Sequence, residues 1–381
     1  MMPLAVNLTG CGGSSGAPNA TGGSGGDAGS VAKSGGAGGG AGAAGVGVAG
    51  SGGAAAGSGG ASGHGGAAGS GGASGGGGQA GAPSGGAGGA AAGTDPTWAQ
   101  WRMPNGAADV AAGAPNPESY TDNGDQTVTD NVTGLMWQQT VSTSTFYTLA
   151  QATALCSGLT LGGHNDWRIP TRIELMSLVD AQQPPSSPLA SASIDATTFA
   201  GNLPFSFWTL SVTITPPTRS MVLDFSDGYI DFVSTDSIIS VRCVRGGSAV
   251  VPAGPAPPGR YTYPATGTVY DTATGLTWQQ TLDATQSYDW ADAKTYCAAL
   301  GATLGGTGWR LPTVTELETI VDETRADPSI DPTAFPGTPH FIFWTLSPVG
   351  TDPRMGLVVN FLDGNTTYYN LAYPINVRCV R

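Results

Sequence analysis

Apolar and polar positions follow two different periods in residues 120–245, and the same succession of periods recurs in residues 261–381. The segments 146–159 (FYTLAQATALCSGL) and 288–300 (YDWADAKTYCAAL) carry apolar residues at helical spacing, which predicts one helix in each stretch. Later segments alternate apolar and polar residues, which is typical of strands with one buried face. The pattern therefore predicts two similar α+β modules in tandem.

Strands are expected in matched pairs, and the dipeptides Asp227-Gly228 and Asp363-Gly364 follow one such pair. Asp-Gly favours tight hairpin turns, so these positions predict hairpins. Each module should thus contain two helices and a mostly antiparallel sheet. The expected strand segments are TGLMWQQT (133–140) and TGLTWQQT (274–281), FWTLS (207–211 and 343–347), MVLDF (221–225) and LVVNF (357–361), and VRCVR (241–245 and 377–381).

One fifteen-residue phrase occurs almost unchanged in both modules, as DWRIPTRIELMSLVD (166–180) and GWRLPTVTELETIVD (308–322). Its Pro-Thr-x-x-Glu core predicts a capping box, in which the threonine hydroxyl accepts a backbone hydrogen bond at the helix start and the glutamate reaches back. The phrase is therefore predicted to begin a helix rather than to supply a general acid. The capping residues are Thr171 with Glu174 and Thr313 with Glu316.

Arg168 and Arg310 precede the capping threonines by three residues. Pairing with a carboxylate or with carbonyl groups is favoured over a role as a substrate clamp. The glycine pairs Gly162-Gly163 and Gly305-Gly306 are predicted to end the first helix of each module.

Four of the five cysteines divide evenly between the modules and have matching surroundings. One disulfide in each module is the simplest pairing, and it implies an oxidising compartment. Buried free thiols are the alternative. The expected pairs are Cys156 with Cys243 and Cys297 with Cys379.

Residues 12–93 contain 38 of the 62 glycines, together with alanine and serine. Such a composition cannot bury enough apolar surface to form a core, so a disordered tether is expected. Leu8-Thr9-Gly10-Cys11 fits a bacterial lipobox, which predicts lipidation of Cys11. The expected location is extracytoplasmic, with the lipid anchored at the bacterial cell envelope, in the outer membrane or at the cell surface. The segment before Cys11 is short and uncharged for a signal peptide, and an unmodified cysteine in a disordered leader is the alternative.

Six segments follow from these patterns. They are a lipoprotein signal remnant (1–11), the tether (12–93), an irregular lead-in (94–119), the first module (120–245), a Pro/Gly linker (246–260) and the second module (261–381).

The series TGLxWQQ, helical cysteine, WR[IL]PT, FWT and VRCVR resembles the C-terminal domain family of bacterial collagen-like adhesins, whose namesake is the Legionella collagen-like protein. The resemblance covers both modules. It implies a variant of the C-type lectin-like fold, display outside the cell and, in the namesake, a trimeric head that binds sulfated glycosaminoglycans.

Charge argues against a polyanionic ligand for this chain. There are 14 Lys and Arg residues against 27 Asp and Glu, a formal net charge of −13. Nucleic acids and sulfated polysaccharides bind clustered cations, which the field of this chain opposes. A neutral glycan or an envelope protein is therefore the expected partner, with no nucleic acid and with membrane contact only through the lipid anchor.

Enzymatic chemistry is not expected. The three histidines do not correspond between the modules, and neither a phosphate-binding loop nor a dinucleotide fingerprint occurs. An enzyme related to sulfatase-modifying oxidases is the distant alternative, but the cysteine spacing suits a structural bridge. No cofactor or metal is predicted; Asn165-Asp166 would suit calcium, but the second module has Thr307-Gly308 there.

The loops at 224–229 and 363–368 differ between the modules while their flanking strands repeat, so they are the expected contact surface. Adhesion or recognition is the predicted function. The alternative is a structural envelope or matrix protein that acts through contacts between modules without a glycan. The candidate ligand-binding residues are Asp227, Tyr229, Asp363 and Tyr368.

Overall fold

The computed structural model describes residues 98–181, 193–199, 206–212, 219–247, 255–283, 285–349 and 352–381. The predictions for the signal remnant, Cys11 and the tether lie outside these residues, as does part of the linker. Both modules fall within one compact unit of the chain. Among the described residues, no helix combines the length and the apolar character that crossing a membrane requires.

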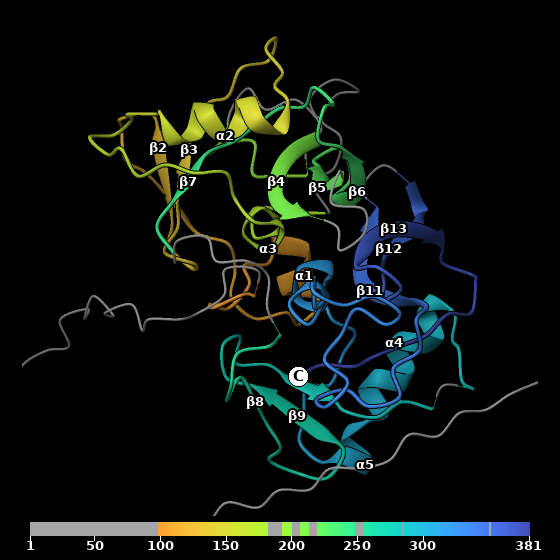
Figure 1. Cartoon of the computed structure of the whole chain (residues 1–381). Coiled ribbons are helices and arrows are strands. Elements are labelled where there is room, and N and C mark those ends of the chain that lie inside the picture. The colour runs from red at the N-terminus through yellow and green to blue at the C-terminus, as the bar shows by residue number, and fades with distance from the viewer. Residues whose placement is uncertain are drawn as a thin grey trace, which may run out of the picture. The chain divides into compact units, whose positions relative to one another are not determined.

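The first module is an α+β arrangement with two antiparallel sheets (Figure 1). One sheet has the order β1-β2-β3-β7, and the other has the order β4-β5-β6. The elements are β1 (Tyr120–Asp122), β2 (Thr127–Asp130), β3 (Met136–Gln138), α2 (Leu149–Ser157), α3 (Arg172–Met176), β4 (Ser206–Val212), β5 (Arg219–Asp224), β6 (Tyr229–Ser234) and β7 (Val244–Arg245).

The second module repeats this plan, with sheets ordered β10-β9-β8 and β11-β12-β13. Its elements are β8 (Tyr261–Thr262), β9 (Thr268–Asp271), β10 (Thr277–Gln279), α4 (Trp290–Ala299), α5 (Gly301–Leu304), α6 (Val314–Glu318), β11 (Ile342–Val349), β12 (Asp352–Asn360) and β13 (Asn365–Asn370). The tandem α+β prediction is confirmed, and the antiparallel strands of each module form two sheets rather than one. The described part of the second module has three helices rather than the expected two, because α5 follows α4 directly, and Gly305 of the predicted glycine pair caps α5 rather than α4.

Two local predictions were wrong. Helix α2 ends at Ser157, before the glycine pair, because Gly158 already serves as its C-cap. In VRCVR of the second module no strand forms, and Val380 makes only isolated bridges with Trp278 and Arg310. In VRCVR of the first module only Val244 and Arg245 form a strand. The preceding Arg242 is instead buried and donates to the carbonyl oxygens of Gln138 and Gln139, the latter at 2.9 Å, so the segment is held by side-chain bonds as well as by backbone pairing.

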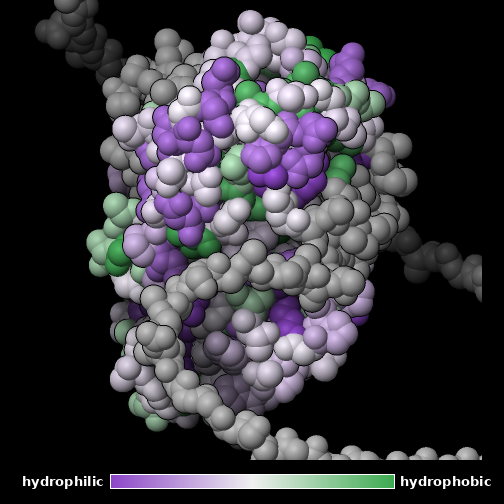
Figure 2. Space-filling model, turned by 90° about the vertical axis from the view of Figure 1, so that its left-hand side faces the viewer, coloured by the Kyte–Doolittle hydropathy of each residue, from purple (hydrophilic) through white to green (hydrophobic). Residues whose placement is uncertain are grey.

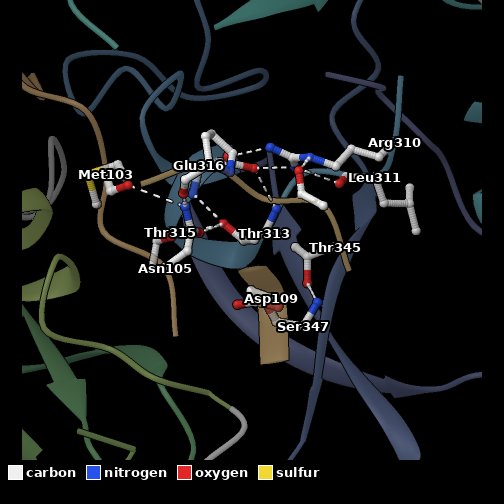
Figure 3. Close-up of polar contacts among 12 residues, drawn as sticks. Met103, Asn105, Asp109, Arg310, Leu311, Thr313, Thr315, Glu316, Thr345 and Ser347 are labelled. Atoms are coloured by element: carbon white, nitrogen blue, oxygen red, sulfur yellow. Dashed lines mark hydrogen bonds and ion pairs between the residues drawn. The ribbon is translucent and has the colours of Figure 1, made fainter. Parts of the chain in front are cut away.

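Both repeated phrases begin a short buried helix with a complete capping box. In the second module the Thr313 backbone N–H donates to Glu316 Oε2 at 3.0 Å, and the Glu316 N–H donates to Thr313 Oγ1 at 3.1 Å (Figure 3). Arg310 forms a two-pronged ion pair with the same glutamate, with both N–O distances 2.7 Å. The capping prediction for Thr171, Glu174, Thr313 and Glu316 is thus confirmed.

The corresponding Arg168 binds Glu174 in the same two-pronged way, at 2.7 and 2.5 Å. Both arginines therefore pair with a carboxylate, as expected. Because each glutamate is only 1% exposed and satisfies an arginine as well as a helix start, the phrase has a structural role in both modules.

Disulfides join Cys156 to Cys243 and Cys297 to Cys379, as predicted. All four cysteines are fully buried. Each bridge lies in a hydrophobic cluster of its own module, with Trp208 beside the first and Trp344 beside the second. A third, larger cluster contains apolar residues of both modules, so the two modules share part of their core.

The lead-in, expected to be irregular, contains the short helix α1 (Ala107–Ala111) and binds to the second module. The Arg260 guanidinium donates to the Ala99 carbonyl oxygen at 2.6 Å. The Thr313 hydroxyl donates to Asn105 Oδ1 at 2.9 Å, directly at the capping box (Figure 3). The segment that precedes the first module in sequence therefore packs on the second module.

Candidate functional site

The turns of the two predicted hairpins meet where β6 and β13 lie side by side (Figure 1). The backbone N–H of Ile230 donates to Thr366 Oγ1 at 2.6 Å, and the Thr366 hydroxyl is 3.3 Å from the Gly228 carbonyl oxygen that it faces. Since Thr366 is fully buried, this contact fixes the first hairpin against the second.

Glycine is required at both turns. Gly228 has φ +83°, and a Cβ there would lie 2.9 Å from Val179 Cγ1. Gly364 has φ +81°, and a Cβ there would lie 2.6 Å from Val321 Cγ1. The two valines are the last residue but one of each copy of the repeated phrase, so the phrase packs against the turns as well as starting a helix.

A cavity of about 330 Å³ opens between the hairpins, and we call it the hairpin cavity. Its lining comes from both modules: Asp224, Ser226, Asp227 and Tyr229 from the first, and Thr367 and Tyr368 from the second. All six residues lie within the loops 224–229 and 363–368, which the sequence predicted to be the contact surface.

The carboxylates of the hairpin cavity are held by local hydrogen bonds. Asp224 accepts from the Ser226 N–H at 2.7 Å and from the Ser206 hydroxyl at 2.8 Å. Asp227 accepts from the Tyr229 N–H at 3.1 Å. These bonds leave acceptor capacity on both carboxylates, because an ionised carboxylate has about four lone-pair sites.

Electrostatics reflect the closeness of these groups. Burial, with a further contribution from Asp224, raises the pKa of Asp227 above its ordinary value. Burial and nearby acidic groups, including Asp231 and Asp227, raise the pKa of the Tyr229 hydroxyl. The tyrosine therefore stays neutral at physiological pH and retains its proton for donation.

The arrangement offers acceptors on Asp224 and Asp227, hydroxyls on Ser226 and Thr367, and aromatic rings on Tyr229 and Tyr368. Tyr368 is 46% exposed, so its ring is available to a ligand. This combination can bind a polyhydroxylated ligand, whose hydroxyls meet the acceptors and whose apolar edges meet the rings. The described residues contain no cluster of three or more His, Cys, Asp or Glu side chains able to hold a metal ion.

Three of the four nominated ligand residues, Asp227, Tyr229 and Tyr368, line one cavity. Asp363 stands beside it: its carboxylate accepts from the Asn365 N–H at 3.3 Å and contributes to the raised pKa of Tyr229, but it does not line the cavity. The local sequence patterns of the two loops did not indicate that the loops lie together in the folded chain. The available signal was Thr366, a polar residue where the first module has the inward-facing Ile230.

The face of the molecule in Figure 2 carries mainly hydrophilic and neutral side chains, with hydrophobic ones in small separate groups. On this face, the side chains that meet water are therefore mostly polar or neutral, with scattered apolar ones, as is usual for a protein surface.

Fold and site together define a protein of two disulfide-bonded α+β modules that share a core and build a polar cavity between their hairpins. The model of the Lcl C-terminal domain family matches residues 126–245 and again residues 267–381. The chain therefore belongs to the Lcl C-terminal domain family, which it contains in two tandem copies. No curated protein matches the chain.

Proposed function

We propose that this chain is a lipid-anchored protein of the bacterial cell envelope whose two modules, C-type lectin-like in fold, recognise a neutral glycan at the hairpin cavity. It acts as a binding protein for adhesion or recognition, not as an enzyme. The observation that carries the proposal is that the two variable loops, one from each module, jointly line a single cavity rich in acceptors and tyrosine.

The charge of the cavity supports a neutral ligand. Asp224 and Asp227 line it, and its described lining includes no Arg or Lys. A sulfated or phosphorylated ligand would meet repulsion there, in a chain whose net charge is already −13. The hydroxyls of a neutral sugar, in contrast, can donate to both carboxylates.

The test is a glycan array probed with the full chain carrying Cys11→Ser, made under oxidising conditions and read with calcium and with chelator. Binding to a related set of neutral glycans is expected. Tyr368→Ala should abolish it, because this exposed ring lines the cavity. Tyr263→Ala is the matched control, because Tyr263 is 51% exposed but lies outside the lining.

The second candidate is a structural envelope protein that acts through contacts between copies. Exposed tyrosines favour it: Tyr373 is 59% exposed, and its ring packs edge-on against Tyr369 with centroids 6.4 Å apart. Silence of the folded chain on the array, together with self-association lost in Tyr373→Ser, would support this function over glycan recognition.

A further inference from the structure

A second cavity of about 380 Å³ lies where the lead-in packs on the second module, and we call it the lead-in cavity. Helix α1, helix α4 and strand β11 contribute to its walls, together with the first residues of the repeated phrase. Its lining consists of Ala108, Ala112, Trp290, Lys294, Ala298, Trp309, Arg310, Leu311, Leu346 and Pro348. It has no residue in common with the hairpin cavity.

The lead-in cavity is cationic although the chain is strongly acidic. Lys294 and Arg310 line it, and its described lining includes no Asp or Glu. The charge of Arg310 is already balanced by Glu316, at 2.7 Å. Lys294 has no carboxylate partner among the described residues: its ammonium lies 3.5 Å from the centre of the Trp290 ring. Partial burial lowers the pKa of this lysine.

Hydrogen bonds to backbone carbonyl groups hold the two tryptophan side chains of the lead-in cavity in place. The Trp290 indole N–H donates to the Thr345 carbonyl oxygen at 2.9 Å, and the Trp309 indole N–H donates to the Gly305 carbonyl oxygen at 2.9 Å. Each indole is thereby fixed, which reduces the ordering cost of binding. Ala108 on α1 and Ala112, the C-cap of that helix, are four residues apart and also line the cavity, and their small side chains leave space for a ligand.

The first module lacks the two residues that give the cavity its character. In the alignment of the modules, Leu149 stands at the position of Trp290 and Thr153 at that of Lys294. At the capping box, the lead-in residue Asn105 accepts a hydrogen bond from Thr313 of the second module. The lead-in residue Gly113 likewise accepts one from Arg310, which lines the cavity. The lead-in cavity is therefore a property of the second module with its bound lead-in, not of the shared repeat.

We propose that the lead-in cavity binds a small organic carboxylate with a ring body, whose carboxylate pairs with Lys294 and whose ring packs on the indoles. An ammonium without a carboxylate partner among the described residues, in a partly desolvated cavity whose described lining holds no Asp or Glu, favours an anion. The volume is in the range of small-molecule pockets. Two sources share this chemistry, a hexuronate and an aromatic carboxylate, and the experiment separates them.

The test uses the fact that the chain has only two lysines, Lys33 and Lys294. The full chain with Cys11→Ser, labelled with ¹³Cε-lysine, gives one NMR signal for each. Titration with glucuronate or with 4-hydroxybenzoate is expected to shift the Lys294 signal and raise its pKa, while Lys33 serves as the internal reference. Glucose, the neutral hexose, should leave both signals unchanged. The carboxylate with the lower Kd identifies the source.

Three variants sharpen the result, with Kd measured by calorimetry. Lys294→Thr and Trp290→Leu restore the residues of the first module, and each should weaken carboxylate binding by about tenfold or more. Thr153→Lys adds a lysine to α2 without a tryptophan and should create no second site. The proposal is overturned if neither carboxylate moves the Lys294 signal at ~20 mM, a concentration well above the Kd of about 1 mM of a weak site. It is also overturned if glucose binds equally well, or if Lys294→Thr leaves the Kd unchanged.

Discussion

Arg172 of the first module is paired with Glu318 of the second, and both side chains are completely buried. The Arg172 Nε–H also donates to Glu323 Oε1 at 2.8 Å. The cation comes from one copy of the repeated phrase and the anions come from the other copy and its C-terminal extension, so the duplicated segments have diverged in complementary ways. The aligned residues are Val314 for Arg172, Met176 for Glu318 and Ala181 for Glu323.

Removing the arginine alone should be costly. Arg172→Val leaves two carboxylates buried without a cation, which is expected to lower the free energy of unfolding by about 3 to 5 kcal/mol. The triple variant Arg172→Val, Glu318→Met, Glu323→Ala exchanges the charges for residues that the other module uses at the same positions. It should recover most of that loss, because apolar replacements of buried ion pairs are often neutral. Urea denaturation measures both, and equal destabilisation of the two variants would contradict this account.

Each disulfide should contribute strongly to stability. The Cys156–Cys243 bridge spans 87 residues of sequence, and a cross-link of this length restricts the unfolded chain by about 4 kcal/mol in the loop-entropy description. The pair of substitutions Cys156→Ala and Cys243→Ala should therefore lower the urea midpoint clearly. The second bridge, which spans 82 residues, provides the matched comparison and should give a loss of similar size. An unchanged midpoint in either variant would refute the prediction.

Gly364→Ala should destabilise the second hairpin, since the backbone has φ +81° and the new Cβ would lie 2.6 Å from Val321. Backbone strain and overpacking together predict a loss of about 2 to 4 kcal/mol. Gly124→Ala is the control: its φ is +74°, but a Cβ there meets nothing within 4 Å, so only the strain of about 1 kcal/mol applies. Equal losses in the two variants would show that the contact with the repeated phrase is unimportant.

Glu118 should make the protein less stable at alkaline pH. Burial, followed by the charges of Asp180, Asp195 and Asp130, raises the pKa of this carboxyl from 4.5 to about 8. The native state therefore holds a proton that the unfolded chain releases, and stability is lost as the pH rises from 4.5 to 8. Just before the second module, Arg260, which aligns with Ser119, pairs with Asp271 at 2.7 Å, and Asp271 aligns with Asp130.

Glu118→Gln should accordingly be more stable than the parent chain at pH 8 to 9, by about 1 to 2 kcal/mol after allowance for solvent screening. At pH 4.5 the two proteins should unfold at the same urea concentration. Denaturation curves across this range provide the measurement. Parallel pH profiles for parent and variant would rule out Glu118 as the source of the slope.

Local sequence signals predicted much of the fold. Pro-Thr-x-x-Glu marked both capping boxes because all the partners lie within four residues of one another. The cysteine pairs followed from matched surroundings, and the Asp-Gly turns followed from the need for positive φ. The loops that line the hairpin cavity were found because they differ between copies whose flanking strands agree.

Contacts between the modules could not be predicted from those signals. The pairing of Arg172 with Glu318 joins positions 146 residues apart, and nothing in either local pattern names the partner. The lead-in was missed for the same reason: Trp98 and Asn105 lie in a segment without periodicity, yet they are 1% exposed because the second module covers them. The lead-in cavity depends on that packing, so it could not be predicted from the sequence either.

The seating of the lead-in on the second module also changes how the chain is connected. A protease that cuts only between Gly247 and Pro255 would separate the modules covalently, but Ala99 and Asn105 of one fragment would still be bound to Arg260 and Thr313 of the other. The N-terminal fragment, which begins with the lead-in, would therefore stay attached to the C-terminal fragment through non-covalent contacts. A pulling force applied to the two ends of this chain would have to break these contacts before it could extend the linker between the modules.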